Sequence, residues 1–374
     1  MKKSLGLLAV LAVACGSAAD PPNQAPSSAS SQPPAPSDSQ RSPAAPAVTG
    51  DGVTLIFEPT RDRPFNVMYL ASDGTHLYAA GYTEVTENGN RPAVDATDPM
   101  KTATLVRVPV RGGTPEVVDY EHGEVAFEVA FDGDNVVWST DHGPVFTRAK
   151  AGGPVTPLDV AGSDGATGLV SDGQGALFWG TWGALKAAPD KPLPALVARM
   201  PGASVATAIQ ETTSPDEAVR SLASDDARIY WMTSGDEIRS MPKSGAAPTT
   251  LATGLPKWSV ELFVDATSLW NKTMDEIWSM PKTGGDRAVV ARARTGHWLG
   301  DFRVTEDAIY WTELPLQGTT ELSPIWTAAR DGSNVHALTS AVFEDAHAIT
   351  TDARAVYWAT GPQGGANAVY THAR

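Results

Sequence analysis

The sequence is poor in cysteine and in long apolar runs. One cysteine, Cys15, occurs in 374 residues, so no internal disulfide can form and thiol chemistry is excluded elsewhere in the chain. The apolar stretch Leu5–Val13 is about nine residues long, whereas a membrane-spanning helix needs about twenty. The motifs Gly-x-Ser-x-Gly and His-Glu-x-x-His, the P-loop and the Rossmann fingerprint are all absent. A folded domain must therefore be held together by packing, and no familiar catalytic motif points to a reaction.

Positive charge is also scarce. The chain has 28 basic and 43 acidic residues, a net charge of −15 and a pI of about 4.8. Nucleic acids and anionic lipid surfaces would repel such a chain, so we expect neither as a partner. Seven histidines are scattered, with no pair at metal-ligand spacing. We expect no resident cofactor, apart from the divalent cation considered below.

The N-terminus has the features of a secretion signal. Lys2 and Lys3 precede the apolar stretch Leu5–Val13, and small residues surround Cys15. The pattern predicts that residues 1–15 are removed or processed during export.

The segment Leu11–Cys15 resembles the lipobox of bacterial lipoproteins, in which the cysteine becomes the lipidated N-terminus. Ala12 departs from the family pattern, which prefers leucine three residues before the cysteine. The resemblance implies an exported protein that is anchored to the cell envelope, and contacts the membrane, only through lipid on Cys15. Gly16 after the cysteine favours the outer membrane by the same resemblance. The alternative is an ordinary secretion signal with a stray cysteine.

Residues 16–49 are rich in proline, serine and alanine and contain no aromatic residue. Such a segment cannot bury enough apolar surface to offset its ordering entropy. We predict a disordered tether with a root-mean-square span of about 30 Å, followed by a folded domain over residues 50–374.

The folded part contains a recurring aromatic strand. Seven pairs occur at similar intervals: Leu77-Tyr78, Val137-Trp138, Phe178-Trp179, Tyr230-Trp231, Leu269-Trp270, Tyr310-Trp311 and Tyr357-Trp358. Their mean interval of about 45 residues matches a four-stranded propeller blade. The pattern predicts an all-β, seven-bladed β-propeller of four-stranded antiparallel blades, with six or eight blades as alternatives.

The strands and turns around these pairs predict further details. Each copy has aspartate in its first hairpin turn and, in most copies, Lys or Arg near Gly in its second, and both turns should lie on one face of the propeller. The alternative for Asp132–Asn135 is a calcium-binding loop. The third copy is divergent, and its expected third strand, Ala184–Ala187, is weak. The seventh copy ends at its third strand, so we predict that Thr54–Phe57 closes the ring as its fourth.

The strands Tyr230–Thr233 and Tyr310–Glu313 resemble YWTD-type and NHL/TolB-like propeller repeats. The match is degenerate, because the fourth motif position is not regularly aspartate and YWTD propellers have six blades. The resemblance implies a propeller fold and extracytoplasmic binding or scaffolding, and it transfers no catalytic residue.

Long connections are expected on the face opposite the Asp and Lys turns, over residues 81–103, 200–217 and 313–323. Loops on a rigid scaffold commonly carry binding residues, so this face is the predicted binding surface for an envelope protein or a small ligand. Its candidate residues are Tyr120, His122, Trp258, His297, Trp298 and Phe343. The alternative for Trp258 and Trp298 is that they only plug the channel mouth.

Three inner strands carry acids in one register, namely Glu128, Glu261 and Asp301, with Asn66 and His347 at roughly that level. Such ligands suit a hard divalent cation. Similar propellers include metal-dependent lactonases and a streptogramin-type lyase. The alternative is that the acids are solvated or paired with Arg220 and Arg303. We therefore expect a non-enzymatic binding scaffold, with a metal-dependent lactonase, lyase or hydrolase as the alternative.

Overall fold

The computed structural model describes residues 52–60, 65–83, 96–122, 125–140, 143–158, 160, 164–316, 322–340, 343, 345–361 and 368–374. The predicted signal, the lipidation site Cys15 and the tether lie outside these residues. Within the described residues, no helix is long and apolar enough to cross a membrane.

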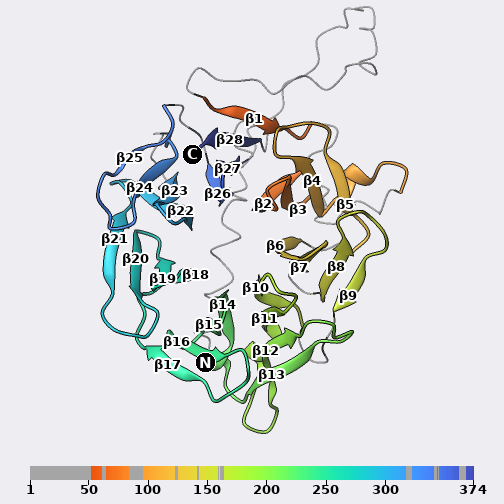
Figure 1. Cartoon of the computed structure of the whole chain (residues 1–374), viewed down its shortest axis with the longest axis vertical. Coiled ribbons are helices and arrows are strands. Elements are labelled where there is room, and N and C mark those ends of the chain that lie inside the picture. The colour runs from red at the N-terminus through yellow and green to blue at the C-terminus, as the bar shows by residue number, and fades with distance from the viewer. Residues whose placement is uncertain are drawn as a thin grey trace, which may run out of the picture. The chain divides into compact units, whose positions relative to one another are not determined.

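The domain is a ring of seven four-stranded antiparallel sheets, as the sequence predicts (Figure 1). Blades 1 to 3 contain β2 (Asn66–Ser72), β3 (His76–Tyr82), β4 (Leu105–Pro109) and β5 (Glu116–Asp119); β6 (Ala126–Asp132), β7 (Asn135–Thr140), β8 (Val145–Ala149) and β9 (Thr156–Leu158); and β10 (Ala166–Ser171), β11 (Leu177–Thr181), β12 (Leu193–Arg199) and β13 (Thr207–Thr212). In each blade the first strand is innermost and lines the central channel.

Blades 4 to 7 follow the same order. They contain β14 (Val219–Ser224), β15 (Arg228–Thr233), β16 (Ile238–Pro242) and β17 (Thr249–Ala252); β18 (Val260–Val264), β19 (Ser268–Lys272), β20 (Glu276–Pro281) and β21 (Ala288–Arg292); β22 (His297–Val304), β23 (Ala308–Pro315), β24 (Trp326–Ala329) and β25 (His336–Ala337); and β26 (Ala346–Thr351), β27 (Ala355–Thr360), β28 (Val369–Ala373) and β1 (Thr54–Phe57). Three short 3-10 helices, η1 (Pro99–Lys101), η2 (Trp182–Lys186) and η3 (Pro215–Glu217), lie in connections.

The core consists of apolar layers between neighbouring blades. The aromatic strands supply the largest buried side chains, including Trp138, Trp179, Trp231, Trp311 and Trp358, each at most 2% exposed. The layer between blades 3 and 4 joins Phe178, Leu222 and Trp231 in one cluster. Each sheet alone is too small to bury its faces, so stacking in a circle is what stabilises all seven.

The ring closes with strands from both ends of the domain. Strand β1 pairs antiparallel with β28, with Thr54 opposite Thr371 and Leu55 opposite Tyr370. The predicted closure is confirmed. It gives blade 7 its fourth strand, and so covers an edge that would otherwise be open to aggregation.

Blade 3 differs from the expectation. Residues 182–186 form η2, and the third strand is β12, which begins at Leu193, twelve residues after β11 ends at Thr181. The expected strand Ala184–Ala187 was wrong, because the Thr181 hydroxyl accepts a hydrogen bond from the Ala184 N–H and caps a helical turn. The connection expected over residues 200–217 is also interrupted, because β13 occupies its centre.

Strand direction defines two faces. The Asp-turn face holds the turns from the first to the second strand and from the third to the fourth strand of each blade. The loop face, on the opposite side, holds the turns into the third strand and the connections between blades.

Candidate functional site

The Asp-turn face is a structural ring of turns and ion pairs. The Asp225 Oδ1 accepts hydrogen bonds from the backbone N–H groups of Ala227 and Arg228, at 2.9 and 2.8 Å. Its Oδ2 receives Lys282 of the next blade at 2.7 Å. Similar pairs join other neighbouring blades: Lys150–Asp73, Arg199–Asp132, Lys243–Asp172, Arg330–Asp265 and Arg374–Asp307. Because Asp132 is paired with Arg199, the contacts of the Asp132–Asn135 turn favour a structural role over a calcium loop.

The loop face is where apolar side chains are left exposed. Ten large apolar side chains in the described part of the chain are exposed, and six belong to this face: Trp182, Leu185, Trp258, Val260, Leu316 and Leu322. They come from η2, from the entry to β18, and from the connection between β23 and β24. The Asp-turn face has Met200, Val205 and Val335.

The predicted binding residues all lie at the loop face but do not form one patch. Trp258 is 42% exposed, whereas His297 is 5% exposed and lies 3.1 Å from Arg294 Nη2. Phe343 packs against the rings of Trp358 and Tyr370. Of the residues in this paragraph, Trp258 alone offers a largely open surface.

The other three candidates are half-buried. His122 Nδ1 lies 2.8 Å from Asp119 Oδ1, and its ring packs on Phe146 at 4.3 Å. Tyr120 follows β5 at the blade edge. Trp298 is partly covered, and its Nε1 is buried with no hydrogen-bond partner.

A β-bulge interrupts the pairing of every inner strand, and this feature was missed from the sequence. The register shifts fall between Val67 and Tyr69, Ala126 and Val129, Thr167 and Val170, Val219 and Ser221, Val260 and Leu262, Leu299 and Phe302, and Ala346 and Ala348. A bulge re-aims a side chain and leaves backbone groups without ladder partners. Glu128, Glu261, Asp301 and His347 all lie at these bulges.

Two of the three predicted acids bridge neighbouring blades. The Leu169 N–H of blade 3 donates to Glu128 Oε2 of blade 2 at 2.6 Å, and the Ile349 N–H of blade 7 donates to Asp301 Oδ2 of blade 6 at 2.9 Å. Burial raises the pKa of Glu128 to about 7, although hydrogen bonds from the Leu169 and Gly168 N–H groups oppose the shift. The acids therefore satisfy N–H groups on the innermost strands of the next blades.

Glu261 has the same register but different contacts. Its Oε1 lies 3.7 Å from Lys272 Nζ, and its Oε2 lies 3.8 Å from Arg303 Nη1 and makes no hydrogen bond. Arg303 also binds Asp301 Oδ1 at 2.6 Å. Burial, together with the negative charge of Asp301, raises the pKa of Glu261 well above its usual range.

The three acids all act on one tyrosine of blade 1. Burial raises the pKa of Tyr69 on β2, and the charges of Glu128, Glu261 and Asp301 raise it further. These side chains come from blades 1, 2, 5 and 6, so the inner strands do bring the predicted acids to one channel.

These acids fit a divalent cation poorly. In the described residues, no group of three or more His, Cys, Asp or Glu side chains is arranged to hold a metal ion. Lys272 and Arg303 would repel a cation near Glu261 and Asp301, and His347 Nε2 contacts the Val67 carbonyl. Asn66 is buried on β2. The metal site stays a prediction that these contacts do not favour.

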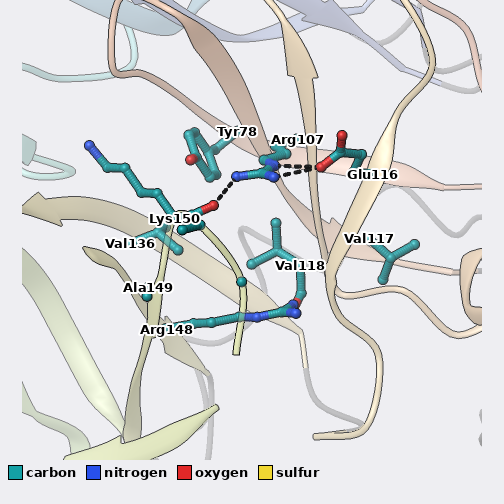
Figure 2. A pocket seen from close by; sticks show the side chains of 11 residues that line it. Tyr78, Arg107, Glu116, Val117, Val118, Val136, Arg148, Ala149 and Lys150 are labelled. Carbon is teal, nitrogen blue, oxygen red and sulfur yellow. Dashed lines mark hydrogen bonds and ion pairs between the residues drawn. The ribbon is translucent and has the colours of Figure 1, made fainter. Parts of the chain in front are cut away.

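A pocket of about 250 Å³ lies between the outer strands of blades 1 and 2 (Figure 2). Its arginines are already engaged, because Arg107 donates to Glu116 at 2.9 and 2.6 Å and Arg148 donates to the Val118 carbonyl. Figure 2 shows the Arg107 guanidinium turned toward Glu116 and the Lys150 carbonyl. Most of its polar groups have partners within the protein, but Tyr78 Oη and Arg148 Nε are buried and make no hydrogen bond.

Comparison with known proteins gives the fold and no family. No family model matches the sequence, and no curated protein matches it. Among solved structures, the chain is similar to virginiamycin B lyase from Staphylococcus aureus, in an inactive variant with quinupristin, at 11% identity and a TM-score of 0.60 over 85% of this chain and 98% of that one.

Two further solved structures are similar to the chain at comparable identity and coverage. YCF48 from Cyanidioschyzon merolae is 10% identical, with a TM-score of 0.56 over 85% of this chain and 98% of that one. U3-55K is 9% identical, with a TM-score of 0.60 over 87% and 98%. At these identities, the likeness extends to the propeller fold alone.

Proposed function

We propose that this protein is a cell-envelope lipoprotein whose propeller binds an envelope protein or a small ligand through its loop face. The observation that carries the binding proposal is the uneven surface. Six of the ten exposed large apolar side chains lie at the loop face, while ion pairs tie the Asp-turn face together. Apolar side chains that are exposed on one face are available for contact with a partner.

The path of the chain supports the same face. Strand β1 is antiparallel to β28, so the chain enters the domain at the Asp-turn face and runs toward the loop face. The predicted tether therefore joins the domain on the side opposite the loop face. A lipid at Cys15 would leave the loop face free to meet a partner.

Site-specific cross-linking tests the binding face. A photoreactive amino acid at position 182 or 258, on the loop face, should give discrete cross-linked products in cells that make the protein. The same residue at position 205, which is 66% exposed on the Asp-turn face, is the matched control. Products from position 205 and none from positions 182 and 258 would reject this face as the binding surface.

A further inference from the structure

The loop-face end of the channel departs from the repeat in blades 5 and 6. Two residues after the aromatic-strand tryptophan, four blades carry a threonine whose hydroxyl bonds to the connection into the third strand: Thr140, Thr181, Thr233 and Thr360. Blade 1, which has Tyr78 in place of tryptophan, has Ala80 at this position. Blades 5 and 6 have Lys272 and Glu313 at this position. In blade 5 the turn is instead bound by Thr273, which accepts the Asp275 and Glu276 N–H groups. The repeat therefore does not require Lys272 for folding.

Lys272 is buried with its donors largely unused. Its side chain is 7% exposed, and its nearest acid is Glu261, at 3.7 Å. In the part of the chain that the structure describes, its ammonium makes that ion pair and no hydrogen bond. An ammonium carries three N–H donors, so Lys272 still has donors to offer a ligand.

Glu261, beside it, also has unused hydrogen-bonding capacity. Its side chain is 32% exposed, and its Oε2 makes no hydrogen bond. Its backbone φ is 55°, and that of Trp258 is 66°. Apart from Gly, Asp and Asn, no other described residue has a positive φ. Both strained residues therefore fall in one four-residue segment at the channel mouth, where strain commonly accompanies function.

Exposed apolar side chains lie close to these polar groups in the sequence. Trp258 and Val260, which are 42% and 40% exposed, begin the segment that leads to Glu261. Lys272 and Arg303 lie beside Glu261 and Asp301, so donors and acceptors of both charge signs are mixed here. A complementary ligand therefore needs an apolar face and groups that both donate and accept hydrogen bonds, and it needs no charge.

Neutral sugars have this combination. Each hydroxyl both donates and accepts, and two neighbouring hydroxyls on one ring can reach a donor and an acceptor that lie 3.7 Å apart. The C–H face of the ring provides the apolar surface for an indole. A peptide fits less well, because the N–H and C=O of a planar trans unit point in opposite directions.

We propose that the loop-face end of the channel, between blades 5 and 6, binds a neutral saccharide. Trp258 stacks on the sugar ring, Lys272 donates to one hydroxyl and Glu261 accepts from its neighbour. This inference rests on the proposed function, since it names the ligand of the same face.

Calorimetric titration of the full chain with short neutral oligosaccharides of glucose, mannose and N-acetylglucosamine tests the proposal. At least one series should bind, and Trp258→Ala and Lys272→Thr should each weaken its binding about tenfold or more. Lys272→Thr restores the residue that the repeat uses, so it should fold normally. Lys257→Thr, at an exposed lysine next to Trp258, is the matched control and should bind as the unaltered protein does.

Absence of binding by all three series, or unchanged affinity in both Trp258→Ala and Lys272→Thr, would overturn the saccharide proposal. Cross-linking from positions 182 and 258 separates this failure from failure of the proposed function. If cross-links persist while no saccharide binds, the loop face still binds a partner and the ligand is of another class, such as a peptide.

Discussion

At the scale of single residues, the inner-strand bulges give similar acids different roles. Glu128 and Asp301 bind backbone N–H groups of the next blade, so their carboxylates are part of the ring's construction. Glu261 faces Lys272 and Arg303 instead, in a backbone conformation that glycine prefers. The corresponding bulge of β10 has Gly168, with φ 61°. The left-handed backbone at Glu261 therefore lowers the stability of the fold, whereas the same conformation at Gly168 does not.

The double variant Glu261→Gly/Lys272→Thr should be more stable than the unaltered protein. A left-handed φ costs a residue with a Cβ about 1–2 kcal/mol, partly offset by the backbone entropy of glycine. Replacing a buried ion pair is often neutral or stabilising. We expect the melting temperature to rise by about 1–4 °C, measured by calorimetry. Glu261→Gly alone should gain less, because it leaves Lys272 buried without its ion pair. A lower melting temperature for the double variant would contradict this account.

At the scale of strands and blades, ion pairs repeat around the Asp-turn face. The cation that follows the third strand of one blade reaches the turn aspartate of the blade before it, as Lys282 does with Asp225. Blade 1 has Val110 at the cation position. At that boundary the Ser72 hydroxyl donates to Asp352 Oδ2 at 3.0 Å. The closing junction therefore uses a neutral hydrogen bond in place of an ion pair.

Asp225→Asn should destabilise the domain, and the effect should depend on pH. Although burial opposes ionisation, hydrogen bonds from Lys282, Ala227, Arg228 and Tyr230 hold the pKa of Asp225 at about 2, below the ordinary 3.8. A depressed pKa in the folded state stabilises the fold above about pH 4, and this contribution is lost as the pH falls toward 2. We expect a loss of about 1–2 kcal/mol at pH 7 after allowance for solvent screening.

Urea unfolding at pH 7 and at pH 3 measures this effect. The difference between Asp225→Asn and the unaltered protein should be smaller at pH 3. Asp226→Asn, at the exposed neighbouring position, should change stability little at either pH. Equal losses in the two variants would show that the ion pair and the turn contribute nothing specific.

At the scale of the whole molecule, closure determines where the chain enters the ring. Because β1 completes blade 7 from the Asp-turn face, the N-terminal segment joins the domain opposite the loop face. Val53, which precedes β1, is fully buried in the layer that contains Tyr310 and Ile325. The entry point is thus fixed by core packing.

Cys15→Ser should release the protein from the membrane fraction if the lipobox resemblance is correct, because serine has no thiol to be lipidated. Immunoblots of separated membrane and soluble fractions measure the change. Ser17→Ala keeps the cysteine and should remain with membranes. Retention of Cys15→Ser in the membrane fraction would reject the lipid anchor, while the propeller and its binding face would be unaffected.

The site was only partly predictable from its residues. The acids were found by register, and the tryptophans by position, because both recur with the repeat. The departure at Lys272 and Glu313 is also visible when the seven copies are aligned, but it was not predicted to belong to a site. The burial of Lys272 and its distance from Glu261 depend on the bulge in β18, and no local sequence pattern predicts that bulge.

The sequence by itself determined the seven blades, the strand order and the closing strand. Period-two alternation and a tryptophan in nearly every copy leave few other ways to bury apolar surface. The tertiary structure alone decided which acids bridge blades, which face cations, and which side chains stay exposed at the loop face. Those outcomes depend on bulges and on contacts between blades, where groups distant in the sequence compete for the same buried partners.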